Sequence, residues 1–122
     1  MKDGNHRKSS RTRLEECWTA LQSLAGDSVS MIVRPSIFHI HDVCRDYVTI
    51  RSASGRVFGI PKEHLRQVLY HIFQSRKITL HQTRIRYSRE HAEYIFGICA
   101  RLPGIRVLEC ATGLVLVLES LA

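Results

Sequence analysis

The sequence lacks several features that would place it in a protein class at once. Its 122 residues include only three prolines, one tryptophan and four cysteines. The cysteines form no CxxC pair, so their spacing fits neither a zinc framework nor a compact disulfide scaffold. No apolar run approaches the roughly 18 residues of a membrane span, and no signal peptide begins the chain. We therefore expect a cytoplasmic protein with no membrane partner and with reduced cysteines: Cys17, Cys44, Cys99 and Cys110.

Motifs of catalysis are also missing. The chain has no glycine-rich phosphate loop, no HExxH and no GxSxG, and its carboxylates do not cluster with a lysine as a metal-dependent nuclease would require. His39 and His41 are the one candidate metal pair, because alternate residues of a strand project to the same face. Further ligands at a recognisable spacing do not accompany them. We expect a non-catalytic protein without a cofactor or a bound metal.

Positive charge is what the sequence has in excess. Eighteen lysines and arginines oppose eleven aspartates and glutamates, which gives a net charge of +7 and favours a polyanionic partner such as nucleic acid. Residues 76–89 contain five cations and no acid. Residues 1–11 are basic and almost without apolar side chains, and we interpret them as a flexible basic arm.

Residues 61–86 predict two helices. Pro61 suits the start of the first helix because its fixed φ is already helical, and apolar residues recur at i, i+3 and i+4 as far as Phe73. Thr79 and Gln82 match a capping box that opens a short helix over residues 80–86. We expect this short helix to bury two apolar residues against the first helix, Leu80 and Ile85.

Residues 88–118 predict a third helix and a hairpin. Ser88 is the expected N-cap of the helix, which Pro103 and Gly104 end. Strands over residues 105–110 and 114–118 flank a turn in which Gly113 can adopt a positive φ. The apolar positions that the helical and hairpin periods turn inward form the expected core: Leu65, Leu69, Ile72, Ile95, Phe96, Leu102 and Leu116.

Two further elements precede this series. Thr12 and Glu15 match a capping box ahead of an amphipathic helix that carries Trp18 and ends near Gly26. Segments 47–51 and 56–60 are rich in β-branched and aromatic residues and flank a polar turn, which predicts a β-hairpin. Nothing after the basic arm of residues 1–11 indicates a domain boundary, so we expect one domain over residues 12–122.

The order of helix, short helix, helix and two strands over residues 61–118 resembles a winged helix-turn-helix domain. The fold class expected from this resemblance is α+β, with an N-terminal helix and an additional small β-hairpin. The resemblance implies a transcriptional regulator or other factor that binds double-stranded DNA, with a homodimer as a further partner because helix-turn-helix dimers read two half-sites. The predicted DNA contacts are Lys77, Arg84, Arg86, Ser88, Arg89 and Arg106, with Arg7, Lys8 and Arg11 in the basic arm.

Two other functions stay open. Glu90 and Glu93 on the third helix would repel phosphates, and the turn of the hairpin carries no cation. Both facts favour a winged helix used for protein association, through the apolar second strand and the helix that carries Trp18. An RNA-binding module is the other alternative, although aromatic residues are few and no ribonucleoprotein-like strand motif occurs. Salt-dependent binding to duplex DNA, and competition by RNA, would separate these functions.

Overall fold

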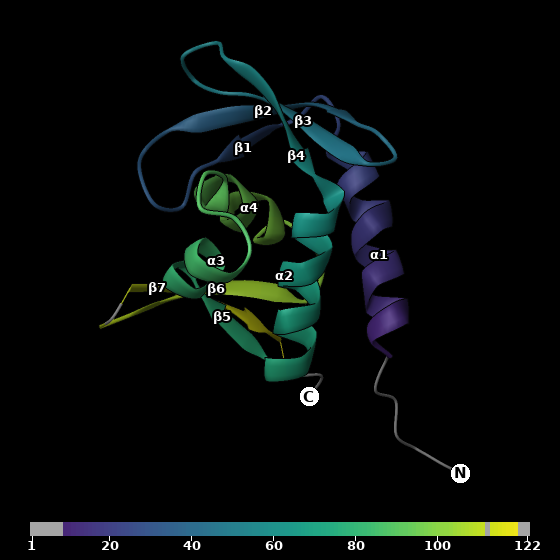
Figure 1. The fold of residues 1–122 in the computed structure, drawn as a ribbon, viewed down its shortest axis with the longest axis vertical. Coiled ribbons are helices and arrows are strands. Elements are labelled where there is room, and N and C mark those ends of the chain that lie inside the picture. Colours follow the sequence, from purple (N-terminus) through teal and green to yellow (C-terminus); the bar gives the residue numbers. More distant parts are fainter. Residues whose placement is uncertain (1–8, 112, 120–122) are drawn as a thin grey trace.

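A computed structural model describes residues 9–111 and 113–119 of the chain. Over these residues, helices lie between two antiparallel sheets, one at the top and one at the bottom of Figure 1. The fold is therefore α+β. In chain order the elements are α1 (Ser10–Ser23), β1 (Ser28–Ser30), β2 (Ile37–Val43), β3 (Tyr47–Arg51), β4 (Val57–Pro61), α2 (Lys62–Ser75), β5 (Lys77–Thr79), α3 (Leu80–Arg86), α4 (Ala92–Cys99), β6 (Ile105–Cys110) and β7 (Gly113–Leu118).

Helix α1 begins earlier than the sequence predicted. Ser9 is its N-cap, and the Ser9 hydroxyl accepts a hydrogen bond from the Thr12 amide at 3.1 Å. The predicted capping box at Thr12 is therefore wrong, because Ser9 supplies the same kind of cap about one turn earlier. Arg11 lies within this helix rather than in a flexible arm. The other two arm residues predicted to bind DNA, Arg7 and Lys8, lie outside the described residues.

The N-terminal half forms a four-stranded sheet in the order β1-β2-β3-β4. Strands β3 and β4 are the hairpin that the sequence predicted, but β1 and β2 extend it on one side, so the expected small hairpin is too small. One face of the sheet is buried through side chains that alternate along its strands: Phe38, Ile40, Val48, Ile50 and Ile60. The sheet therefore covers part of the helical layer and is not an isolated hairpin.

The C-terminal hairpin is part of a three-stranded sheet in the order β5-β7-β6. Its third strand, β5, has only three residues and was not predicted, because so short a segment shows no period. It places β7 at the centre of the sheet, where Val115, Leu116 and Leu118 are buried. This central position explains why the second strand of the hairpin is apolar along its whole length.

Helices α2 and α3 lie where the sequence predicted them. The capping box of α3 is confirmed, since the Thr79 hydroxyl accepts from the Gln82 amide at 2.9 Å and the Gln82 side chain accepts from the Thr79 amide at 3.0 Å. The prediction that Ile85 is buried is wrong, because its side chain is 63% exposed. The residue that α3 turns fully inward is Thr83, whose hydroxyl donates to the Thr79 carbonyl at 2.9 Å.

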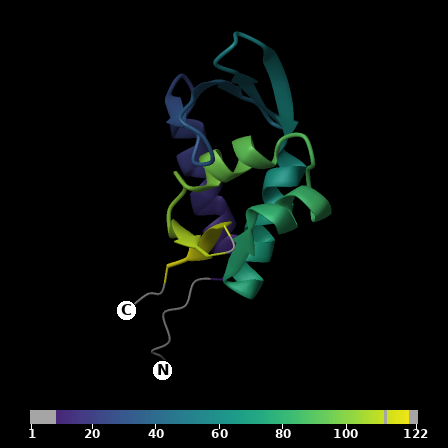
Figure 2. The ribbon, with the colours of Figure 1, turned by 90° about the vertical axis from the view of Figure 1, so that its left-hand side faces the viewer.

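Helix α4 is shorter than predicted and lies between the two sheets (Figure 2). Ser88 does not cap it directly. The Ser88 hydroxyl accepts from the His91 amide at 3.2 Å, and this holds a turn that precedes the helix, so His91 takes the N-cap position. Six of the eight residues of α4 are buried.

The packing of the first sheet on α4 is close. A Cβ atom on Gly97 would lie 3.1 Å from Cε1 of Phe38, so the missing side chain allows the sheet to approach the helix. The rings of Phe38 and Tyr94 meet edge to face, with their centroids 5.2 Å apart. All seven residues of the predicted core are buried, but the sequence did not indicate that this sheet shares the core with them.

Candidate nucleic-acid interface

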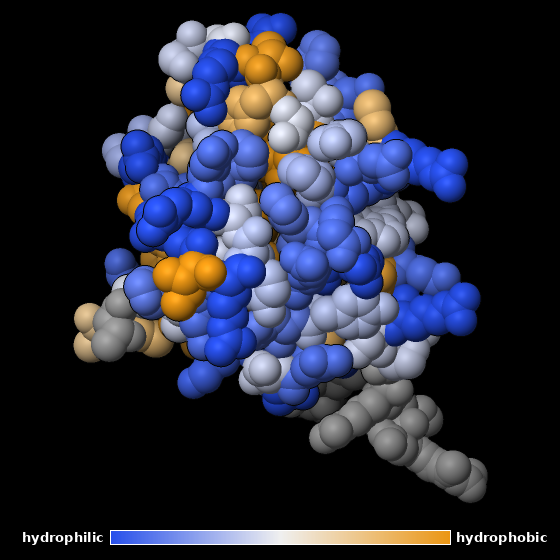
Figure 3. All heavy atoms as spheres, viewed as in Figure 1, coloured by the Kyte–Doolittle hydropathy of each residue, from blue (hydrophilic) through white to orange (hydrophobic). Residues whose placement is uncertain are grey.

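Three of the predicted DNA contacts surround one hollow at α3. It has a volume of about 340 Å³ and is lined by the consecutive residues Arg84, Ile85, Arg86, Tyr87, Ser88 and Arg89. The capping box orients this short helix, and the turn held by the Ser88 hydroxyl brings Arg89 back beside it. Figure 3 shows the face over α2 and α3 as largely hydrophilic, with a small apolar spot over α3. The surface is therefore positively charged and open to solvent.

Arg84 is partly neutralised by an acid of α4. Its guanidinium lies 3.0 Å from a carboxylate oxygen of Glu93. The other oxygen of Glu93 lies 2.7 Å from Arg34, in the loop between β1 and β2. Glu93 thus connects α3 and the first sheet through α4, and its negative charge is directed at the two arginines. The sequence suggested only that Glu93 would repel phosphates.

Arg86 and Arg89 are available for an anion. Within residues 9–111 and 113–119, neither of them has an ion-pair partner. Arg86 lies close enough to His71 to lower the pKa of that imidazole, although burial is the larger cause of the shift. His71 shares a hydrogen bond of 2.8 Å with the Tyr87 hydroxyl, which fixes the end of α3 against α2.

Lys77 and Arg106 form a second basic pair on the three-stranded sheet. Both are register partners of Val117, one on each side of the central strand. Residues that face each other across neighbouring strands project to the same side of a sheet, and both side chains are exposed. The structure therefore places these two predicted contacts in one row, which their separation of 29 positions in the sequence gave no means to predict.

The remaining predicted contact, Ser88, is in a different position. Its side chain is only 8% exposed, and its hydroxyl is used in the hydrogen bond to the His91 amide. We therefore assign Ser88 the role of holding the turn between α3 and α4. Arg89, its neighbour, is the exposed residue of this turn.

The structure also shows the surroundings of the candidate metal pair. A bulge between Ile40 and Asp42 interrupts the register of β2 where His41 lies, so the simple alternation of the two histidines does not hold. His39 instead shares a hydrogen bond of 2.8 Å with Ser28 on β1. No group of three or more His, Cys, Asp or Glu residues is placed to hold a metal ion in the described part of the chain.

Two further hollows lie along α2, and the sequence did not indicate them. The larger, about 590 Å³, is bounded by α1, by the turn between β2 and β3, and by the start of α2. The smaller, about 370 Å³, lies between the second half of α2 and the end of α3. Their linings come from elements that are far apart in the sequence, so no local motif could have revealed them.

Comparison of the chain with protein-family models, with curated proteins and with solved structures gives no match. Among the described residues, no helix combines the length and the apolar character needed to cross a membrane.

Proposed function

We propose that the chain binds double-stranded DNA without catalysis, as a transcriptional regulator or another DNA-associated factor. The observation that carries this proposal is the hollow at α3, where Arg84, Arg86 and Arg89 meet and two of the three arginines have no partner among the described residues. Guanidinium groups bind phosphate oxygens well because their donors form a fork. The net charge of +7 adds long-range attraction to the same polyanion.

The proposal includes a winged helix-turn-helix arrangement over residues 61–118. It is supported by the order α2, β5, α3, α4, β6, β7 and by the three-stranded sheet in which the first strand pairs with the last. In such domains the second helix of the pair enters the major groove. Here that helix is α4, which is largely buried under the four-stranded sheet. We therefore propose contacts from α3 and the following turn to the phosphate backbone, and not insertion of α4 between base edges.

Lys77 and Arg106 are secondary contacts in this proposal. They share one row on the three-stranded sheet, so the backbone of a duplex that lies on α3 would need to extend over that sheet to reach them. Arg11 lies on α1, and we propose for it only non-specific attraction. Contacts to phosphates position a protein but carry no sequence information directly. The proposed binding is therefore weakly sequence-dependent and strongly dependent on salt.

Salt dependence provides the test. Replacing Arg84, Arg86 and Arg89 by alanine should weaken binding to a short DNA duplex strongly, and should flatten the slope of log affinity against log salt by about three, because each lost contact releases about one counterion fewer. Arg51→Ala is the matched control, since Arg51 is an exposed cation on the four-stranded sheet, and its slope should stay that of the parent. Equal binding by the folded triple variant would disprove the proposed site.

One observation favours protein association as a second candidate function. The outer face of the four-stranded sheet exposes Ile37, Tyr47 and Val57, each more than half exposed. The apolar strand β7, which the sequence suggested for such a contact, is central and largely buried. A homodimer, if it forms, would therefore use the sheet face. Sedimentation of the parent and of Val57→Asp tests this candidate, because a charge there should dissociate the dimer.

A further inference from the structure

A continuous line of hollows follows the exposed side of α2. Arg66 lines both the hollow of about 590 Å³ at the start of the helix and the hollow of about 370 Å³ near its end. The second hollow reaches Arg86, which also lines the hollow at α3. Since 14 residues of helix extend for about 21 Å at about 1.5 Å per residue, the line is long enough for an extended ligand.

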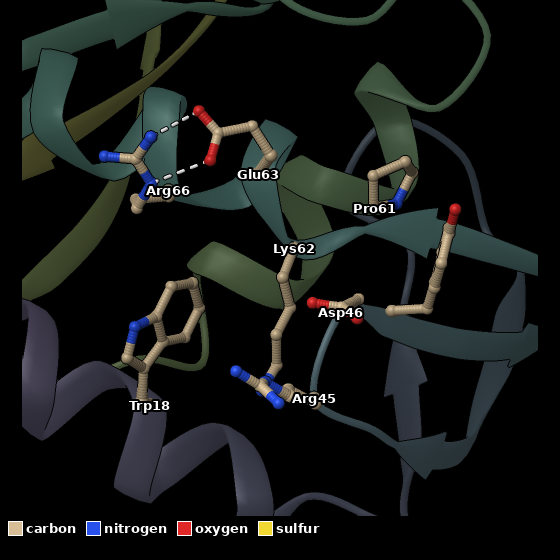
Figure 4. Close-up of a pocket in the computed structure, with 8 residues that line it drawn as sticks. Trp18, Arg45, Asp46, Pro61, Lys62, Glu63 and Arg66 are labelled. Atoms are coloured by element: carbon tan, nitrogen blue, oxygen red, sulfur yellow. Dashed lines mark hydrogen bonds and ion pairs between the residues drawn. The ribbon is translucent and has the colours of Figure 1, made fainter.

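Aromatic rings alternate with cations along this line. The Lys62 ammonium lies 5.4 Å from the centre of the Trp18 ring, and the Arg66 guanidinium lies 5.7 Å from the centre of the Tyr70 ring. Figure 4 shows Trp18 from α1, Arg45 from the turn before β3 and Lys62 from α2 around one space. Each ring face is thus covered by a flexible cationic side chain, which another planar group can displace.

The charge along the line is positive. The lining of the two hollows contains Arg45, Lys62, Arg66 and Arg86 against the carboxylates Asp46 and Glu63. Glu63 is held by Arg66, whose Nε donates at 2.9 Å, and this contact lowers the pKa of the carboxyl. Three cations then remain against one carboxylate. The surface therefore suits a chain of anions that also carries flat apolar groups.

We infer that this line binds single-stranded DNA, with bases stacked on Trp18 and Tyr70 and phosphates held by Arg45, Lys62 and Arg66. Repeated aromatic rings beside cations are the means by which proteins hold unpaired strands without reading their sequence. Paired bases cannot reach these rings, because both faces of each base are stacked inside the duplex. The inference goes beyond the duplex site at α3 and uses different residues, although the choice of DNA over RNA rests on the proposed function.

The chain contains a reporter for this test, because Trp18 is its only tryptophan. The full chain is titrated with oligo(dT) of about 12 nucleotides, within the range of about 4–16 that single-strand folds cover, at several salt concentrations. Trp18 fluorescence should be quenched to saturation, and binding should be at least about tenfold tighter than that of a duplex or of poly-glutamate at the same salt.

Variants with a labelled oligonucleotide separate stacking from charge. Trp18→Ala should weaken binding at least about fivefold, the lower end for loss of one stacked base, whereas Trp18→Phe should keep most of it. Lys62→Ala should flatten the salt slope by about 0.7, the value for one phosphate contact on a single strand. Arg51→Ala, outside both hollows, should leave affinity and slope unchanged.

Each contrary outcome overturns the inference. These are the absence of quenching at low salt, equal binding of poly-glutamate, tighter binding of oligo(U) than of oligo(dT), or parental binding by Lys62→Ala and Trp18→Ala together. The duplex experiment with the triple arginine variant is independent. Loss of single-strand binding with intact duplex binding removes only this inference, and the reverse result removes only the proposed function.

Discussion

The position of the four-stranded sheet on α4 decides how this protein can bind a partner, and Phe38 tests it. Phe38 lies on β2, is 1% exposed and contacts both Tyr94 and the space left by Gly97. Replacing it by alanine removes a ring that joins the sheet to the helix. A buried aromatic side chain of about 150 Å² contributes about 4 kcal/mol at about 25 cal/mol per Å², so we expect a loss of about 3–5 kcal/mol.

The neighbouring residue provides a matched control. Ile37 lies on the same strand but faces outward and is 52% exposed. Ile37→Thr keeps the β-branch that strands favour, so its effect on the free energy of unfolding should stay within about 0.5 kcal/mol. Urea denaturation followed by tryptophan fluorescence and circular dichroism measures both variants, and a change of midpoint at constant slope reports stability alone.

A small effect of Phe38→Ala would refute the reasoning. If the loss is below about 1 kcal/mol, or no larger than that of Ile37→Thr, the sheet does not pack on α4 in solution. The outer side of α4 would then be open, and contact of this helix with the major groove would return as the better proposal. A large effect would restrict duplex binding to α3 and its turn.

Two further predictions concern Glu93 and the histidines. Glu93→Gln should release Arg84, so duplex affinity should rise severalfold and the salt slope should steepen by about one, at a cost in stability below about 1 kcal/mol because its partners Arg34 and Arg84 are well exposed; Glu109→Gln, which removes an equal charge on β6, should leave the slope unchanged, and a parental slope in Glu93→Gln would show that Arg84 contacts no phosphate. Burial lowers the pKa of His91 below its ordinary value of 6.5, so the unfolded chain binds more protons and stability should fall as the pH drops below about 6.5. His91→Phe, which keeps the stacking on Phe58, should reduce that fall but not abolish it, since burial also lowers the pKa of His71; an unchanged pH profile in urea unfolding would disprove this assignment.

Much of the helical layer was predictable because its signals are local. The capping box at Thr79 is contained in four consecutive residues, and the apolar stripe of α2 repeats over almost four turns, so neither depends on distant parts of the chain. The hairpin of β6 and β7 was equally local, since one short turn joins its strands. These elements brought all seven predicted core residues inside.

Errors arose where an element was short or its cap had a rival. Helix α3 has seven residues, about two turns, so its few apolar positions do not define an inward face, and Ile85 is exposed where burial was predicted. Strands β1 and β5 have three residues each and owe their conformation to the strands beside them. Ser9 and Thr12 can both cap α1, and only the hydrogen bonds that form distinguish them.

The sequence by itself determined the order of the main helices and strands, the residues of the core and the excess of positive charge, because periodicity, caps and composition are properties of neighbouring residues. Only the tertiary structure decided which surfaces remain open. It covers α4 with the four-stranded sheet, directs Glu93 at Arg84 and Arg34, and brings Trp18 beside Lys62 across 44 positions of sequence. Such contacts join residues whose separation along the chain carries no pattern, so they follow from the packing of complete elements and not from any one segment.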